Sequence, residues 1–346
     1  MRKNIQMQKA LSFYLISKIG FTGMMLLVLP IFFGQTVFRL DDFVYYLDGG
    51  LGLGPNIGYR WLIALLGINS LNEPLPIFLA STLNILIDVI WLYMLREHLT
   101  TKGLLFLALA LGLQPYLATY SMKFSSIIFA KIGILYFIRQ LFADGFQKAP
   151  KRGLSSLEII MWLALAAIRN SNLFIAAPYI FMRMRKNIWI GLLVTSVFVS
   201  VFYFLSLGYL SGLDPSNRPW SLDYVRNLIG IDSNLIALPI LIVARILILF
   251  GAREKLYNDG LEPFLVWGMP GLELAIYFVL SLIQLIGFFV AINFLVAKYG
   301  KPSLLLLIPL LLALFTVVHQ RYLIPFIPIC LFGLALLFDQ IRRTNK

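Results

Sequence analysis

The stretch of sequence that decides the fold is residues 11–48, LSFYLISKIGFTGMMLLVLPIFFGQTVFRLDDFVYYLD. Its first part, Leu11 to Gly34, is an apolar run long enough to cross about 30 Å of hydrocarbon as a helix. Its second part, residues 40–48, holds three carboxylates, among them the adjacent pair Asp41 and Asp42. Only 16 of the 346 residues are acidic. An acidic pair just outside a membrane span therefore indicates either a solvated loop or a site that deprotonates a hydroxyl or binds a metal.

The whole chain has the composition of a polytopic membrane protein. It is 60% hydrophobic and only 13% charged, which is more apolar surface than a soluble domain buries. Further apolar runs reach or approach the roughly 20 residues of a membrane span. Because lipid offers no hydrogen bonds to the backbone, each such run is expected to be a helix. The runs are continuous and do not alternate, which excludes a closed barrel.

We expect a single transmembrane domain, residues 1–346, that is all-α and has about ten membrane-spanning helices. The expected spans are residues 11–34, 74–95, 103–118, 126–142, 157–168, a short run that returns to Arg183, and residues 188–209, 271–296, 304–318 and 323–338.

Two outer loops contain apolar stretches that are not counted as spans. The first outer loop, residues 35–73, carries the acidic pair and then a short apolar stretch that Tyr59 and Trp61 would anchor as an interfacial helix. The long outer loop, residues 210–270, contains the apolar run 235–250, which we expect to be an interfacial or re-entrant helix.

Basic residues set the orientation of the chain in the membrane. With the N-terminus in the cytoplasm, sixteen Lys and Arg residues fall in cytoplasmic segments and five in the short outer loops. Counting residues 235–250 as a span would move Arg342, Arg343 and Lys346 to the outside, so both termini are expected in the cytoplasm. No small-residue cleavage site follows the basic N-terminal segment, which indicates a retained signal anchor.

The net charge of +13 agrees with this bias and with attraction to anionic lipid headgroups. The basic residues are scattered among short loops, so a nucleic-acid partner is not expected. Cys330 is the single cysteine, which excludes a disulfide within the chain and a cysteine metal site. His98, among Arg96 and Glu97, is expected to be solvated.

A few charged residues interrupt the spans. Asp88 and Lys131 lie within the expected second and fourth spans, where they would form an ion pair or where Lys131 would snorkel to the surface. The run 157–168 is too short to cross a full bilayer. The turn that follows it would therefore lie below the outer surface, with Arg169 inside the membrane zone and facing water or a polar ligand.

The expected topology gathers cationic and polar residues on the outer side. The candidate phosphate-binding residues are Arg60, Lys123, Arg169, Asn170, Arg218, His319, Arg321 and Tyr322. Arginine presents a planar fork of donors that matches phosphate oxygens. Asp41 or Asp42 could then take a proton from an acceptor hydroxyl while a lipid phosphate leaves. This combination suits sugar transfer from a polyprenyl-phosphate carrier, and the sequence has no phosphate-cradling GxxxxGK[ST] loop for a nucleotide.

At these residues the chain resembles integral-membrane glycosyltransferases of the GT-C superfamily. It is similar in particular to phage-type serotype-converting O-antigen glucosyltransferases. The resemblance rests on Asp41-Asp42, on Gly58-Tyr59-Arg60-Trp61-Leu62, on the short helices around Arg169-Asn170, and on His319-Gln320-Arg321-Tyr322-Leu323-Ile324-Pro325. In that family Gly-Arg is usual, and here Tyr59 intervenes. The resemblance implies that Asp41 or Asp42 is the catalytic base, or a ligand of a divalent metal such as Mg²⁺ or Mn²⁺, and it leaves open which.

Two other functions stay open. One is an O-antigen or exopolysaccharide polymerase that acts on repeats linked to undecaprenyl pyrophosphate. Its pattern of Arg, ten residues and then Gly is not met, because Ile180 follows Arg169 and Leu256 follows Arg245 at that spacing. The other is a transporter or flippase for a lipid-linked sugar, which would depend on Asp88 and Lys131. The small size favours a bacterial inner membrane, with the active site facing the periplasm.

Overall fold

The computed structural model describes the following residues: 2–24, 57–68, 74–114, 117, 124–144, 155–169, 172, 175–176, 179–180, 226–227, 230, 233–250, 270–307, 309–310 and 323–344. Within these ranges all regular structure is helical and no residue is in a β-strand. The all-α class is therefore confirmed for the part of the chain that the structure describes.

The helices follow the apolar runs of the sequence. They are α1 (Arg2–Gly23), α4 (Ile57–Leu65), α5 (Pro74–Leu95), η2 (Arg96–His98), α6 (Thr101–Leu113), α8 (Ile127–Asp144), α9 (Ser156–Ile168), α13 (Asn234–Leu249), α14 (Pro270–Tyr299), η5 (Lys301–Leu306), η7 (Ile324–Phe326) and α16 (Ile327–Thr344).

Three of the described helical segments are long and apolar enough to cross a membrane. They are Pro74–His98, Phe278–Tyr299 and Ile324–Arg342, with 25, 22 and 19 residues. Each coincides with an expected span, and together they fit a membrane protein. The expected number of about ten spans is not shown, because the described part of the chain contains these three, and α6 and α9, with 13 residues each, are shorter. Residues 188–209 lie outside the described part of the chain.

Two helices differ from their expected ranges for local reasons. α1 begins at Arg2 rather than near Leu11, and Met7 and Ala10 from this extra length are buried in the core. α6 ends at Leu113, and Gln114 has extended backbone angles (φ −71°, ψ 118°). Residue 115 is a proline, which disfavours helical angles in the residue before it.

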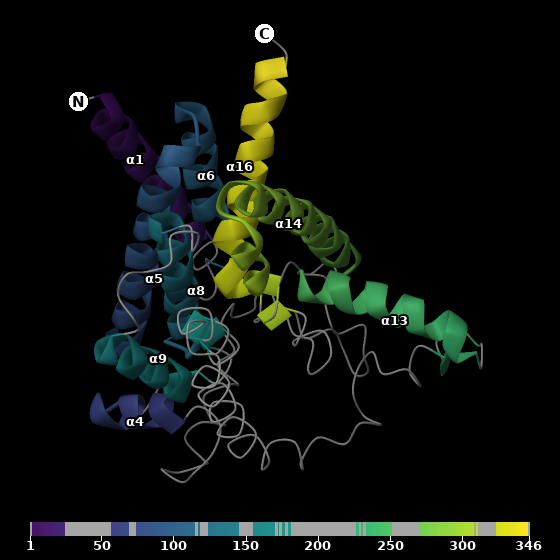
Figure 1. Cartoon of the computed structure of the whole chain (residues 1–346), viewed down its shortest axis with the longest axis horizontal. Helices are drawn as coiled ribbons and strands as arrows, with labels where there is room; N and C mark the ends of the chain where they lie inside the picture. Colours follow the sequence, from purple (N-terminus) through teal and green to yellow (C-terminus); the bar gives the residue numbers. More distant parts are fainter. Residues whose placement is uncertain are drawn as a thin grey trace.

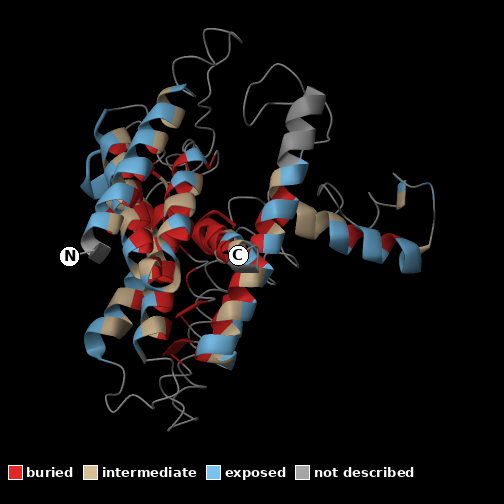
Figure 2. Ribbon diagram, turned by 90° about the horizontal axis from the view of Figure 1, so that it is seen from above, coloured by how far each residue is buried: buried red, intermediate tan, exposed pale blue. Residues whose placement is uncertain are grey.

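Four of these helices form a bundle, in which α1 packs on α6, and α16 packs on both α6 and α14 (Figure 1). Figure 2, seen from above, shows that the buried residues, in red, lie on the parts of the ribbon where these helices face one another. Glycines allow the closest contacts. A Cβ on Gly333 of α16 would overlap the backbone of Gly287 on α14, so the two backbones meet directly at their crossing.

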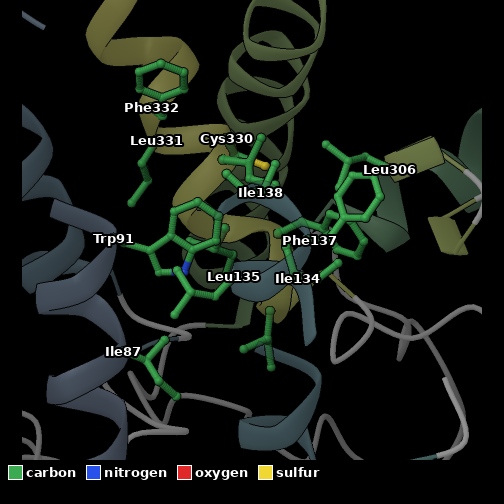
Figure 3. Packing of buried hydrophobic residues seen from close by; sticks show 14 of the residues in the cluster. Ile87, Trp91, Ile134, Leu135, Phe137, Ile138, Leu306, Cys330, Leu331 and Phe332 are labelled. Carbon is green, nitrogen blue, oxygen red and sulfur yellow. The ribbon is translucent and has the colours of Figure 1, made fainter. Parts of the chain in front are cut away.

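The core is continuous across the bundle. Figure 3 shows Trp91 of α5 and Leu135 of α8 directed toward the residues around Cys330 of α16. Trp91 and Cys330 are fully buried and Leu135 is almost so. Since these residues come from distant parts of the sequence, burial of their apolar surface holds α5, α8 and α16 together.

One polar contact fixes the start of α6 against α16. The carboxylate of Asp339 accepts hydrogen bonds from the backbone N–H of Thr100, at 2.8 Å, and from the Thr100 hydroxyl. Thr100 is the N-cap of α6, and its Oγ1 accepts from the N–H of Gly103. A carboxylate at a helix N-terminus is also favoured by the helix dipole.

Helices α4 and α13 run across the direction of α5 and α16 (Figure 1). Along α13 most apolar side chains are exposed, with Leu235 at 87% and Val243 at 56%. Ala237 and Leu241 are buried along its length, and at its C-terminal end Leu249 and the following Phe250 are buried, where the Phe250 ring contacts that of Phe288.

Candidate functional site

Two helices that carry candidate site residues, α4 and α9, are both hydrogen-bonded to the residues just before α8. The hydroxyl of Tyr59 on α4 donates to the backbone carbonyl of Phe124. Nη1 of Arg169, at the end of α9, donates to the hydroxyl of Ser126 at 2.9 Å. α4 also packs on α9, because a Cβ on Gly58 would lie 2.9 Å from the backbone of Ala167. The structure thus brings the helix that carries Arg60 close to the end of α9.

The turn after α9 is buried against the first turns of α8. Arg169 is 7% exposed and Asn172 is fully buried. The side-chain amide of Asn172 donates to the carbonyls of Leu165 at 2.9 Å and Phe129 at 3.2 Å. α9 has 13 residues, or about 20 Å at 1.5 Å per residue, which is less than a full membrane span. That Arg169 lies inside the membrane zone and faces water or a polar ligand stays a prediction.

The other candidate residues are only partly reached by the structure. Arg60 is half-buried on α4. Lys123 and Asn170 are adjacent in sequence to Phe124 and Arg169 but lie outside the described residues. The remaining candidates outside the described residues are Asp41, Asp42, Arg218, His319, Arg321 and Tyr322.

The expectation that Tyr59 is an interfacial anchor is wrong. Tyr59 is 1% exposed and its ring packs near that of Phe124, with ring centroids 6.1 Å apart. Its hydroxyl reaches a backbone carbonyl, so the ring can be buried without an unpaired polar atom. Trp61, the other expected anchor, is 58% exposed.

A buried polar cluster joins α1, α5 and α8. Nζ of Lys131 lies 3.0 Å from Oδ1 of Asp88, which confirms the expected ion pair. The same ammonium donates to Oδ1 of Asn84 at 2.8 Å. The hydroxyl of Tyr14 donates to Oδ2 of Asp88 at 2.9 Å. Both carboxylate oxygens of Asp88 are therefore engaged, which keeps the charged form satisfied in an apolar surrounding.

Sequence reasoning did not identify Tyr14 and Asn84 as members of this cluster. One signal was present, because Asn84 and Asp88 are four residues apart and share one face of α5. Lys18 follows Tyr14 by the same interval on α1. Lys18 is buried and donates to the backbone carbonyl of Leu117 at 3.0 Å.

His98, which was expected to be solvated, is half-buried and makes specific contacts. Its Nδ1 lies 2.9 Å from Nζ of Lys298, and its Nε2 lies 3.1 Å from the hydroxyl of Tyr299. The imidazole edge meets the ring of Phe142, with centroids 4.8 Å apart. Since an ammonium only donates, Nδ1 is the acceptor and the proton of neutral His98 is assigned to Nε2. The ends of η2, α8 and α14 meet at this histidine.

No group of three or more His, Cys, Asp and Glu residues within the described ranges is placed to hold a metal ion. Asp41 and Asp42, the expected metal ligands, lie outside those ranges.

Comparison of the chain with models of protein families, with curated proteins and with solved structures found no match.

Proposed function

We propose that the protein is a membrane glycosyltransferase that moves a sugar from a polyprenyl-phosphate donor to a glycan or lipid-linked acceptor. The observation that carries this proposal is the meeting of α4, the segment before α8 and the end of α9. Arg169 is buried where these three segments meet, and Arg60 lies on α4, which is one of the three. A buried guanidinium beside the short outer connections is suited to bind a lipid phosphate.

The proposed chemistry uses one carboxylate and the arginines. Asp41 or Asp42 takes the proton of an acceptor hydroxyl, and that oxygen attacks the anomeric carbon of the donor sugar. The bond from this carbon to the phosphate oxygen breaks, and its electron pair leaves with the phosphate. Negative charge grows on that phosphate in the transition state, where fixed cationic donors stabilise it. A divalent metal held by the same carboxylates would supply further charge stabilisation when bound.

The arrangement of the helices supports the proposed topology of about ten spans. The start of α1 and the end of α16 lie toward the same end of the bundle, as expected if both termini are cytoplasmic (Figure 1). α4 and α13 run across the spanning direction, as interfacial helices do. The proposed location is a bacterial inner membrane, with Arg60 and Arg169 on the periplasmic side.

The test is transfer of a radiolabelled sugar from a polyprenyl-phosphate donor by purified protein in nanodiscs, with Arg169→Gln compared with wild type. If Arg169 donates hydrogen bonds to the leaving phosphate in the transition state, its replacement should lower the rate of sugar transfer about 10²–10³-fold. The matched control is Arg139→Gln, because Arg139 is exposed on α8. Thermal unfolding of each variant separates lost transfer from lost folding. Full transfer by a folded Arg169→Gln variant would contradict the proposal.

One observation favours a second candidate, a transporter or flippase for a lipid-linked sugar. Asp88 and Lys131 form a buried ion pair in the bundle, and charged residues there often belong to ion or substrate pathways. A flippase predicts that Asp88→Asn stops movement of a labelled lipid-linked sugar across proteoliposomes. A transferase predicts that sugar transfer depends on Arg169.

A further inference from the structure

Ser126, at the start of α8, holds the guanidinium of Arg169. Nη1 of Arg169 donates to Oγ of Ser126 at 2.9 Å, and the serine is only 1% exposed. Ser126 is itself held in place, because its carbonyl accepts the N–H of Phe129 at 3.2 Å. The hydroxyl that receives the arginine therefore belongs to a residue fixed by the first turn of a long helix.

The backbone of Arg169 is fixed separately, by Asn172 and the end of α9. The N–H of Asn172 donates to the carbonyl of Arg169 at 2.9 Å, and the N–H of Arg169 donates to the carbonyl of Leu165 at 2.9 Å. The side-chain amide of Asn172 ties this turn to the carbonyl of Phe129 on α8. With its backbone held, the freedom left to Arg169 lies in its long side chain, which the contact with Ser126 restricts.

The chemical nature of this contact suits an arginine that binds an anion. A hydroxyl oxygen orients a guanidinium but, unlike a carboxylate, brings no negative charge to cancel its positive charge. An arginine held in one geometry before the ligand arrives binds more tightly, because ordering a long side chain on binding costs affinity. Ser126 supplies this order and leaves the charge of Arg169 in place for a phosphate.

We propose that Ser126 is a positioning residue, which holds Arg169 in the orientation that binds the phosphate of the polyprenyl-phosphate donor. This inference rests on the proposed function for the role of Arg169. Ser126 acts through the arginine, so its effect on binding exists only when the arginine is present.

The experiment is equilibrium binding of a radiolabelled polyprenyl phosphate to the full chain in phosphatidylcholine nanodiscs. It compares wild type, Ser126→Ala, Arg169→Gln and the double variant. Because one long side chain must then be ordered on binding, Ser126→Ala should bind about two- to tenfold more weakly than wild type. The double variant should bind no more weakly than Arg169→Gln alone. Ser126→Thr keeps the hydroxyl and should keep most of the affinity.

The matched control is Ser155→Ala. Ser155 is an exposed serine that caps the N-terminus of α9, the opposite end of that helix from Arg169. Its replacement removes a helix cap and should lower stability while leaving binding unchanged. Thermal unfolding of every variant in the same nanodiscs then separates general destabilisation from lost positioning.

Two results would overturn the inference. The first is that Ser126→Ala binds as tightly as wild type while Arg169→Gln binds weakly, which leaves the proposed function standing. The second is that Ser126→Ala weakens binding by the same factor with and without Arg169, which would make the role of Ser126 purely structural. Binding that Arg169→Gln does not change contradicts both the inference and the proposed site.

Sugar transfer, measured separately on the same samples, distinguishes this inference from the proposed function. Binding that depends on Ser126 only when Arg169 is present, without any sugar transfer, supports the inference and contradicts the transferase.

Discussion

Lys131 on α8 and Asp88 on α5 form a salt bridge of 3.0 Å in which neither side chain is more than 1% exposed. Tyr14 on α1 donates a hydrogen bond of 2.9 Å to the same carboxylate. Three helices that are far apart in the sequence therefore share one buried charged group. Its charge is satisfied only when all three are in place.

Removing one partner of this salt bridge should be costly. Lys131→Met leaves Asp88 charged and buried, which predicts a loss of about 3–5 kcal/mol of stability. Asp88→Asn should also destabilise the protein, because it leaves Lys131 charged and buried without its carboxylate partner. The double variant should lose less than the sum of the two single variants, because the charges are then removed together. Thermal unfolding in detergent measures this coupling, and strictly additive losses would mean that the pair contributes no specific interaction.

A side chain at the crossing of α14 and α16 should not be tolerated. Gly333→Ala would place a methyl group in the backbone of Gly287 and push the helices apart, for an expected loss of about 1–3 kcal/mol or more. The control is Gly20→Ala, where no atom lies within 4 Å of the added Cβ. There the better helix propensity of alanine predicts a gain of up to about 1 kcal/mol. Equal melting temperatures for the two variants would argue against this crossing.

The extent of several helices could be predicted from the sequence. α5 covers Pro74–Leu95, as expected, because a proline opens the run and charged residues follow it. The pairing of Asp88 with Lys131 was also foreseeable, since an acid and a base in two neighbouring apolar runs have few other partners. Other contacts between distant segments were not foreseeable. Tyr59 carries no sequence signal of its bond to Phe124, which only the folded chain brings near.

The cap formed by Asp339 should stabilise the start of α6. Asp339→Ala removes the acceptor for both the backbone and the hydroxyl of Thr100, the N-cap of α6, and loss of hydrogen bonds to a charged group costs about 1.5–3 kcal/mol. Gln340→Ala, at the exposed neighbouring position, is the control and should change stability little. Thermal unfolding of both variants tests this, and an unchanged Asp339→Ala protein would contradict the role of the cap.

Packing of the His98 ring should contribute more to the stability of the protein than its hydrogen bonds do. His98→Phe keeps an aromatic ring against Phe142 and loses the hydrogen bonds to Lys298 and Tyr299, for about 0.5–1.5 kcal/mol. His98→Ala also removes the ring packing, so it should destabilise the protein more than His98→Phe does. Chemical unfolding of the two variants gives the comparison. A phenylalanine variant as unstable as the alanine variant would show that the polar contacts dominate.

The candidate site was predictable in part for a physical reason. A charged residue in an apolar run, such as Arg169, is expensive to bury and is therefore conspicuous in sequence. The polar partners that make its burial tolerable, such as Ser126, are common residues and give no such signal. Sequence reasoning can thus identify the charges of a membrane site, whereas the partners appear only in the fold.

The central claim is that a carboxylate of the first outer loop performs sugar transfer. The most direct test compares the mass of the glycan made in membranes from cells that produce wild type, Asp41→Asn or Asp42→Asn, with the protein level checked for each. The account predicts that at least one substitution abolishes transfer while the protein stays folded and abundant. Addition of EDTA to the wild type then separates a metal ligand from a general base. Full transfer by both variants would contradict the account.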